Sequence, residues 1–248
     1  NSKATSPPAY TQQALILDPP QKKVFLGETF PVKVLVRTDR EEANLIATKI
    51  TFPKDLLKVS SIKKDEIVIK QWVEEYFDND RGEISLIGAV YNPPLKTDPA
   101  KPLTFATINF TSKGEGIGEI NFAEGSAIYS NETGNDTLIN RHGLKLEVYQ
   151  DTDKDGFADS LENKLKTSPT IVCSVNKGKV KVDGWPPDLN LDRKVSGSDL
   201  SAMQSFMKSK KGVKKYNIRY DLNIDGKIDQ TDVDIIKQYI NRVCTKPV

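Results

Sequence analysis

Oxygen-bearing side chains recur at a fixed spacing near the C-terminal end of this 248-residue sequence. Two twelve-residue segments, 188–199 and 221–232, each place such side chains at positions 1, 3, 5, 9 and 12, and a segment of helical periodicity follows each. A loop that wraps one hard cation uses this spacing, with a backbone carbonyl as the ligand at position 7. The predicted ligands are Asp188, Asn190, Asp192, Lys194, Ser196, Asp199, Asp221, Asn223, Asp225, Lys227, Asp229 and Asp232, the two lysines through their carbonyls.

A third segment of the same kind lies earlier in the chain, at 151–162. It has acids at positions 1, 3, 5, 9 and 12, and its Asp-Thr-Asp-Lys-Asp-Gly run is similar to thrombospondin type 3 repeats. The predicted ligands are Asp151, Asp153, Asp155, Phe157 through its carbonyl, Asp159 and Glu162. Because every donor is an oxygen and the chain has one His, we expect Ca²⁺, about three ions, rather than Mg²⁺ or zinc.

The loops differ at two positions. Position 6 needs a sharp left-handed turn, and Arg193 stands there in the first duplicated loop, where the backbone strain costs on the order of 1 kcal/mol. We therefore predict that 188–199 is the weakest calcium site. Position 8, which forms a short β contact between paired loops, is Val195 or Ile228 in the duplicated loops but Ala158 in the third. The third loop is thus expected to be unpaired.

The duplicated loop–helix pattern resembles a type I dockerin, the calcium-dependent plug of cohesin–dockerin pairs. The resemblance implies partner contacts at loop positions 10 and 11 and on the exposed face of the following helix. In this sequence those contacts are Ser198, Gln204, Ser205, Gln230, Thr231, Lys237, Gln238 and Arg242. The alternative is that these residues are only solvated helix faces. Because the first set is small and neutral and the second is polar and cationic, we expect one dominant binding mode.

The N-terminal half of the chain alternates apolar and polar residues with a period of two. Runs such as Phe30–Val36, Ile46–Phe52 and Leu144–Val148 are separated by Gly, Pro and Asn turns, which predicts an antiparallel β-sandwich of about eight or nine strands. The run Phe25-Leu-Gly-Glu-Thr-Phe-Pro-Val, followed by Ile50-Thr-Phe-Pro-Lys-Asp, resembles the core pattern of a cohesin-like jelly roll. The predicted fold class is therefore mixed and multidomain, with this sandwich followed by a small all-α, calcium-binding dockerin-like domain.

These patterns divide the chain into four parts. Residues 1–11 are expected to be a linker or a remnant outside the folded domains, 12–149 the cohesin-like sandwich, 150–167 a calcium-binding linker repeat and 168–248 the dockerin-like domain. The two cysteines of the chain, Cys173 and Cys244, flank the duplicated loops. They could be buried thiols, but calcium loops imply an extracellular setting, which favours a disulfide.

Composition and motifs favour a binding protein over an enzyme. The net charge of +2 gives no indication of nucleic-acid binding, no apolar run could span a membrane, and the basic run 208–215 is interpreted as a solvated linker. His142 has no nucleophile motif around it, and Glu74 and Glu75 are adjacent, so on a strand they point to opposite faces. We predict a non-catalytic, secreted or cell-surface assembly protein.

Two partner hypotheses follow from this interpretation. In the first, the protein recognises cohesin or dockerin modules of other proteins or of its own chain. In the second, the sandwich is a carbohydrate-binding or adhesin module, which could bind polysaccharide, and the dockerin-like domain only docks it. A glycan site needs exposed planar rings, and Trp72, Tyr76 and Phe77 are the candidates. Their simpler interpretation is a partly buried loop or helix over the sandwich.

Overall fold

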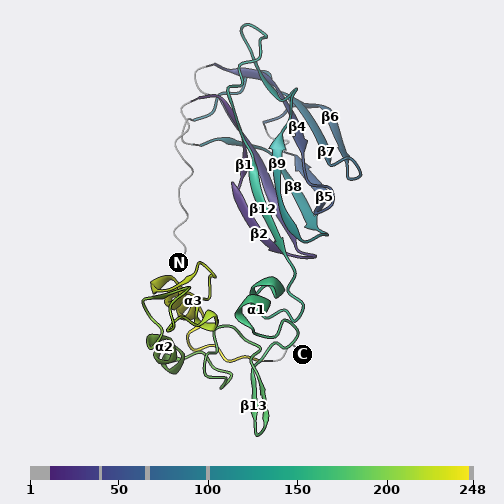
Figure 1. The fold of residues 1–248 in the computed structure, drawn as a ribbon. Helices are drawn as coiled ribbons and strands as arrows, with labels where there is room; N and C mark the ends of the chain where they lie inside the picture. Colours follow the sequence, from purple (N-terminus) through teal and green to yellow (C-terminus); the bar gives the residue numbers. More distant parts are fainter. Residues whose placement is uncertain (1–11, 39–40, 65–67, 99–100, 246–248) are drawn as a thin grey trace. The chain divides into compact units, whose positions relative to one another are not determined.

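The computed structural model describes residues 12–38, 41–64, 68–98 and 101–245, so the linker expected at 1–11 lies outside the described part of the chain. The described residues form two compact units that divide between Val148 and Tyr149. Figure 1 shows a first unit built of strands and a second that carries the helices. Each unit has a hydrophobic core of its own.

The first unit is a sandwich of two β-sheets. One sheet has the order β11-β1-β3-β8-β5, and the other has the order β2-β12-β9-β4-β7-β6 with β10 paired to β4. The strands are β1 (Ala14–Asp18), β2 (Gln21–Phe25), β3 (Thr29–Arg37), β4 (Ala43–Thr51), β5 (Leu57–Lys64), β6 (Gln71–Asp78), β7 (Glu83–Ala89), β8 (Leu103–Ser112), β9 (Gly116–Phe122), β10 (Ala127–Ser130), β11 (Asn140–His142) and β12 (Leu144–Tyr149).

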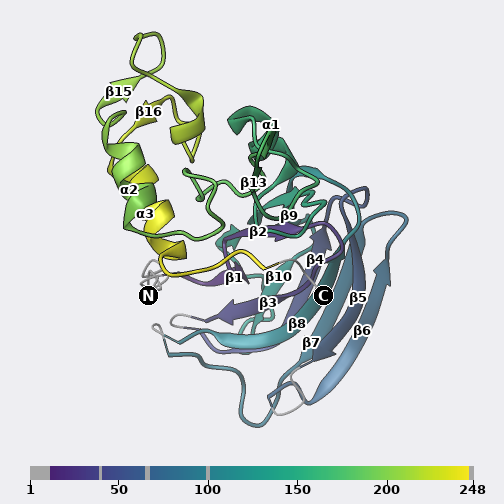
Figure 2. The ribbon, with the colours of Figure 1, turned by 90° about the horizontal axis from the view of Figure 1, so that it is seen from below.

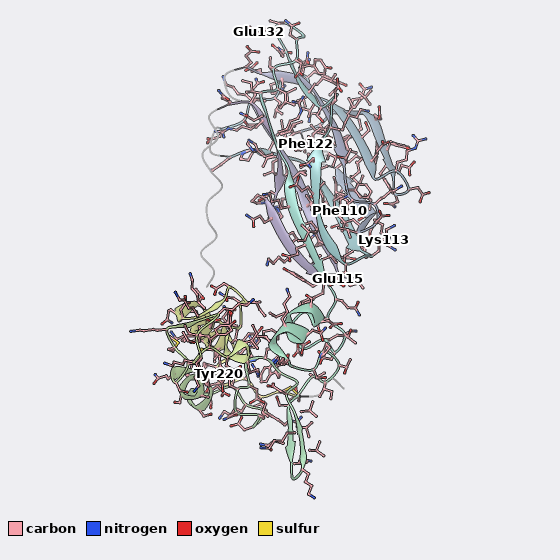
Figure 3. All side chains as sticks on the ribbon, in the orientation of Figure 1. Phe110, Lys113, Glu115, Phe122, Glu132 and Tyr220 are labelled. Carbon is pink, nitrogen blue, oxygen red and sulfur yellow. A yellow bond between two sulfur atoms is a disulfide. The ribbon has the colours of Figure 1, made fainter. Side chains whose placement is uncertain are left out.

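The period-two residues of the sequence form the core of this sandwich. Phe30 and Phe110 stack with ring centroids 6.2 Å apart, and Phe52 meets Phe110 edge-on at 5.3 Å. Phe110, which Figure 3 labels, is fully buried. The predicted sandwich is confirmed. It has more strands than expected, because short strands such as β2, β10 and β11 are too brief to show an alternation. One pair, β1 with β11, is parallel and therefore departs from the predicted antiparallel arrangement.

The segment with the candidate glycan-binding rings is a strand, not a loop or a helix. It forms β6, at the edge of its sheet, with a register shift between Trp72 and Glu74. The Trp72 ring packs on Phe105, with centroids 4.8 Å apart, so its face is covered by the core. Tyr76 and Phe77 are exposed but adjacent on the strand, and they therefore point to opposite sides of the sheet.

The second unit is mostly helical, with two short two-stranded sheets that the all-α prediction did not include. Figure 2 shows α2 and α3 lying beside one another, and they pack in one hydrophobic core. The elements are α1 (Asp159–Leu165), β13 (Val175–Lys177), β14 (Val180–Val182), α2 (Gly197–Gln204), β15 (Ser209–Lys210), the 3₁₀ turn η1 (Ile218–Tyr220), β16 (Lys227–Ile228) and α3 (Gln230–Tyr239).

The core of this unit includes the third loop. Phe157 and Leu165, from the segment 150–167, are buried there, and the Phe157 ring lies 5.3 Å from that of Tyr239. The segment therefore belongs to the C-terminal unit, which differs from the separate linker expected from the sequence. Cys173 and Cys244 form a disulfide, as predicted, and the Trp185 ring meets Tyr239 edge-on.

Candidate calcium sites and partner surface

The first duplicated loop is held by hydrogen bonds from its own backbone. The Asp188 carboxylate, which is fully buried, accepts from the backbone N of Asp192 at 3.1 Å and of Arg193 at 3.0 Å. The Asp199 carboxylate, also buried, accepts from the backbone N of Leu189 at 2.9 Å and of Ser196 at 2.8 Å. The carboxylates at positions 1 and 12, Asp188 and Asp199, thus hold the loop backbone around one centre.

The second duplicated loop repeats this framework 33 residues later. Asp221 accepts from the backbone N of Asp225 at 3.1 Å and of Gly226 at 2.9 Å, and Asp232 accepts from Leu222 and Asp229 at 2.7 Å and 2.9 Å. Each helix begins with a capping box, on Ser196 or Asp229 at position 9. The position-9 oxygens therefore cap a helix, while positions 1, 3, 5 and 12 surround the loop centre.

The left-handed turn expected at position 6 is present in all three loops. Arg193 has φ +70°, in the same region as Gly226 at +88° and Gly156 at +95°. A side chain in this conformation is strained, whereas glycine is not. The physical basis for a weaker first loop is therefore in place, and the affinity order itself stays a prediction.

The two duplicated loops are joined by their tails and not by a direct contact of position 8. Ile228 pairs with Ser209, which follows α2, and Val195 exchanges backbone hydrogen bonds with Asn241 and Arg242, which follow α3. The prediction that Val195 and Ile228 form a β contact with each other was therefore wrong, because each bonds the segment that follows the other repeat's helix. Each repeat instead closes the loop of the other, so backbone hydrogen bonds join the two repeats.

The third loop is closed in a different way. Asp159, at position 9, accepts from the backbone N of Thr152 at 2.7 Å and from its hydroxyl at 2.5 Å. In the duplicated loops position 12 makes the corresponding bond to position 2. Because Asp159 does this here, Glu162 at position 12 stays free of the loop backbone and is fully buried. Asp159 thus closes the loop, whereas the sequence assigned it as a ligand.

Carboxylate oxygens without a proton donor converge in the third loop. Among the described residues, Oδ2 of Asp153, Oδ2 of Asp155 and Oε2 of Glu162 are buried without a hydrogen-bond partner. One oxygen each of Asp151, Asp153 and Asp155 lies within 4.8 Å of the others. Burial, reinforced by the neighbouring carboxylates, raises the pKa of Asp155 to about 8 and that of Glu162 to about 9. Such oxygens fit a hard divalent cation, which would satisfy all of them.

The duplicated loops also bury carboxylates. Burial raises the pKa of Asp188 and of Asp232 above the usual range, although backbone N–H groups oppose the shift. A hydroxyl from outside the loop supports position 1 in each case, Ser174 for Asp188 and Tyr216, at 2.5 Å, for Asp221. The oxygen ligands, their burial and this outer support fit calcium in both loops.

Arg219, which no motif singles out, ties the entrance of the first loop to the second repeat. Its guanidinium bonds the Asp183 carboxylate, at 2.5 Å and 2.8 Å, and donates to the carbonyls of Pro186 at 2.6 Å and Asp188 at 3.3 Å. Nearby, the Tyr220 ring, labelled in Figure 3, stacks on Phe206 with centroids 4.0 Å apart. Phe206 and Met207 lie beyond the end of α2 and pack on the core.

The residues predicted to contact a partner are at the surface. All eight positions are exposed: Ser198, Gln204, Ser205, Gln230, Thr231, Lys237, Gln238 and Arg242. The Arg242 guanidinium lies 5.0 Å above the Tyr239 ring, which also meets Phe157 of the third loop. The predicted partner contacts of the second repeat are therefore connected to the third loop through Arg242 and Tyr239. Those of the first repeat have no such connection among the described residues.

Comparison with known proteins identifies the duplicated segment. Residues 186–241 match the family model of the dockerin type I domain. The segment is dockerin-like, as its sequence predicted. Dockerin type I domains bind calcium and serve in protein–protein assembly, and the match covers both duplicated loops. A comparison with curated proteins gives no match.

Solved structures similar to this chain are cohesin modules and cohesin–dockerin complexes. A type I cohesin–dockerin complex from Clostridium thermocellum is 18% identical with a TM-score of 0.46, over 55% of this chain and 99% of that chain. The cohesin module of a Clostridium perfringens family 33 glycoside hydrolase is 12% identical with a TM-score of 0.44, over 57% and 99%. A ScaB type I cohesin from Pseudobacteroides cellulosolvens is 12% identical with a TM-score of 0.45, over 56% and 93%.

Proposed function

We propose that this protein is a non-catalytic, extracellular assembly protein that binds calcium and acts through cohesin–dockerin-type recognition. The observation that carries the proposal is the duplication. The two loop–helix units each make the same hydrogen bonds at equivalent positions, in a segment that matches the dockerin type I domain. The chain places this segment after a β-sandwich with a core of its own.

Three calcium ions would occupy the three loops. In each duplicated loop, the side chains at positions 1, 3, 5 and 12 and the carbonyl at position 7 would hold one ion. In the third, Asp151, Asp153, Asp155 and Glu162, with the carbonyl of Phe157, would hold another. The ions would have a structural role, because at free calcium a thousandfold above the dissociation constant one site adds about 4 kcal/mol of stability.

The setting that fits these features is outside the cell. A disulfide such as Cys173–Cys244 persists in oxidising compartments, and calcium loops of this kind remain filled at millimolar calcium. Within the described residues, no helix is long and apolar enough to cross a membrane. We assign no catalytic residue. Glu74 and Glu75 instead bond to lysines from different sheets, Lys49 at 2.9 Å and Lys64 at 2.5 Å.

The partner would be a cohesin module, from another protein or from a second copy of this chain. The exposed residues of α3 offer polar and cationic contacts, and those of α2 offer small neutral ones. We therefore expect the second repeat to dominate. A glycan-binding sandwich receives less support, because the Trp72 ring is covered by Phe105 and the remaining candidate rings point to opposite sides of β6.

The test is a titration of residues 149–248 into residues 1–148 and, separately, into a panel of type I cohesin modules. Binding to either that disappears with a calcium chelator is the expected result, and binding to residues 1–148 would establish self-recognition. The cut at 148 keeps the third loop with the core that contains it. An absence of calcium-dependent binding to any of these proteins would overturn the proposal.

Matched variants test which repeat dominates. Lys237→Ala with Gln238→Ala removes side chains at positions equivalent to those of Gln204→Ala with Ser205→Ala, 33 residues apart. We expect the first pair to weaken binding about tenfold or more and the second pair by less than about threefold, as a few contacts usually carry most of the binding energy. Equal losses would mean that both repeats are used.

A further inference from the structure

The C-terminal unit has a charge distribution that the net charge of the whole chain hides. From residue 149 to 248 there are 18 Lys and Arg against 14 Asp and Glu, and 12 of these acids lie in the three calcium loops. The two other acids, Asp183 and Asp234, form ion pairs with Arg219 and Lys237. Three bound Ca²⁺ ions would offset half of the twelve loop charges and raise the net charge of residues 149–248 from +4 to +10.

Part of this surface is a cluster that we call the lysine patch. It is seated on the second duplicated loop, because the backbone N of Lys208 donates to Ile228 and that of Lys211 to Gly226, both at 2.8 Å. The strands β15 and β16 hold the rest in register. The patch consists of Lys208, Lys210, Lys211, Lys214, Lys215 and Lys227, all exposed.

The patch contains an unfavourable pairing. Lys210 lies directly opposite Lys227 in the β15–β16 register, and like charges at such positions are destabilising. None of the six lysines forms an ion pair with another residue of the described chain. Lys215 donates to the carbonyl of Met207 at 3.2 Å, which ties its ammonium group to the segment after α2.

The fold itself does not require a lysine at positions 208, 210 and 211. The duplication supplies the comparison, since the equivalents of Lys208, Lys210 and Lys211 are Asn241, Val243 and Cys244. Lys208 and Asn241 both have a left-handed backbone, with φ of +60° and +66°, and both donate to the position-8 carbonyl of the other repeat's loop. The same backbone therefore forms with and without the lysines, and their presence on one side needs another explanation.

Calcium would strengthen the field of the patch. The second loop has four aspartates, so with six lysines the local net charge is +2. One bound Ca²⁺ raises it to +4 without moving a lysine. A surface of this kind attracts polyanions, and the attraction falls steeply with ionic strength.

We propose that the lysine patch, once the second duplicated loop holds calcium, binds a polysaccharide with repeated anionic groups. The proposal rests on calcium binding by that loop and not on recognition of a cohesin. Sulfate, phosphate and carboxylate groups are all acceptors for the point charges that lysines provide. The patch presents no exposed ring to stack a nucleic-acid base, because Phe206, Tyr216 and Tyr220 are half-buried and pack against the core of the unit.

The experiment uses the full chain and dextran sulfate, with uncharged dextran of the same length as a control. Affinity is measured by calorimetry at 50 and 200 mM salt, with calcium and with a chelator. We expect binding to dextran sulfate and none to uncharged dextran. The affinity for dextran sulfate should fall at least tenfold at the higher salt and at least fivefold with the chelator. A DNA duplex and polyglutamate are titrated in parallel, and tighter binding to either would overturn the choice of polysaccharide.

A matched pair of triple variants separates the patch from overall charge. Lys210→Gln, Lys211→Gln and Lys214→Gln remove three charges from the patch, and Lys177→Gln, Lys179→Gln and Lys181→Gln remove three from the β13–β14 hairpin. We expect a loss of about tenfold or more from the first variant and less than about twofold from the second. Equal losses, or affinity unchanged by the chelator, would overturn the proposal.

A further variant covers the case in which the patch triple does not fold. Lys210→Val introduces the residue that the equivalent position already holds, so the backbone tolerates it. We expect a twofold to fourfold loss of affinity for dextran sulfate, with an unchanged circular dichroism spectrum. Unchanged affinity in this variant would count against the patch.

Discussion

The third loop and the duplicated loops have the same ligand spacing but close in different ways. In the duplicated loops, the acid at position 12 bonds backbone N–H groups and is satisfied before any cation arrives, as Asp232 is by Leu222 and Asp229. In the third loop, Asp159 closes the loop, and Glu162 is buried with an oxygen that has no donor among the described residues. A shared spacing therefore does not imply a shared dependence on the metal.

This difference predicts which part of the C-terminal unit responds most to calcium. Both kinds of loop bury carboxylates, but those of the duplicated loops keep a network of hydrogen bonds without the ion, whereas the third loop then buries carboxylate oxygens that have no donor among the described residues. Since Phe157 and Leu165 anchor that loop in the core, its response reaches the whole unit.

Removal of calcium should give the largest effect, and the effect should grow with pH. Without metal, the folded-state pKa values of Asp155 and Glu162, about 8 and about 9, exceed those of the unfolded chain, 3.8 and 4.5. The folded unit then binds more protons than the unfolded chain, so its stability falls as pH rises from about 4 to about 9. In chelator, the melting temperature of the full chain's C-terminal transition should be several degrees lower at pH 8 than at pH 5.

The sandwich provides the internal control for that measurement. Its melting transition should not depend on calcium, because its core contains none of the loop carboxylates. With calcium present, the C-terminal transition should no longer fall with pH between 5 and 8. A chelated unit that is as stable at pH 8 as at pH 5 would show that the third loop is not strained by its carboxylates.

A matched pair of neutral variants tests the difference between the loops directly. Without calcium, Glu162→Gln should stabilise the C-terminal unit above pH 7, because it removes a buried carboxyl group that must either take up a proton or stay charged. Asp232→Asn should destabilise it by about 1 to 3 kcal/mol, because the carboxylate accepts from two backbone N–H groups. Chemical denaturation in chelator at pH 8 measures both.

Calcium titration of these two variants completes the test. Each should lose one calcium ion of the total measured for the wild-type protein, since each lacks the acid at position 12. If Glu162→Gln and Asp232→Asn shift the denaturation midpoint in the same direction without calcium, the proposed difference in loop closure is wrong.

The smallest effect concerns position 6 of the duplicated loops. Arg193→Gly should relieve left-handed strain of about 1 kcal/mol, which corresponds to about fivefold tighter calcium binding in the first loop. Gly226→Arg should weaken the second loop by a similar factor. Amide chemical shifts of each loop during a calcium titration would resolve the two sites. Tighter calcium binding by the first loop than by the second in the wild-type protein would contradict the order predicted from Arg193.

The sequence was sufficient for features set by local periodicity and spacing. The core strands, the helix after each loop and the left-handed turn at Arg193 follow from side-chain pattern and backbone sterics over a few residues. The pairing of Cys173 with Cys244 could be favoured because the calcium loops indicated an oxidising compartment. The length of Glu162, one methylene more than Asp199 or Asp232, was the available signal that the third loop closes differently.

Features that depend on distant segments could not be predicted in this way. Arg219 bonds Asp183, 36 residues away, and neither residue belongs to a motif. The cross-pairing of each loop with the tail of the other repeat depends on the packing of α2 against α3. The β13–β14 hairpin had a local signal, Gly178 between valine-bearing segments, but each strand has only three residues.

The disulfide has a mechanical consequence for a protein that connects others. Tension applied between Tyr149 and Cys244 passes along the chain to Cys173 and crosses the covalent bond directly to Cys244. The segment between the two cysteines, which contains both duplicated loops, α2 and α3, lies outside this covalent path. The third loop lies within this path, between Tyr149 and Cys173.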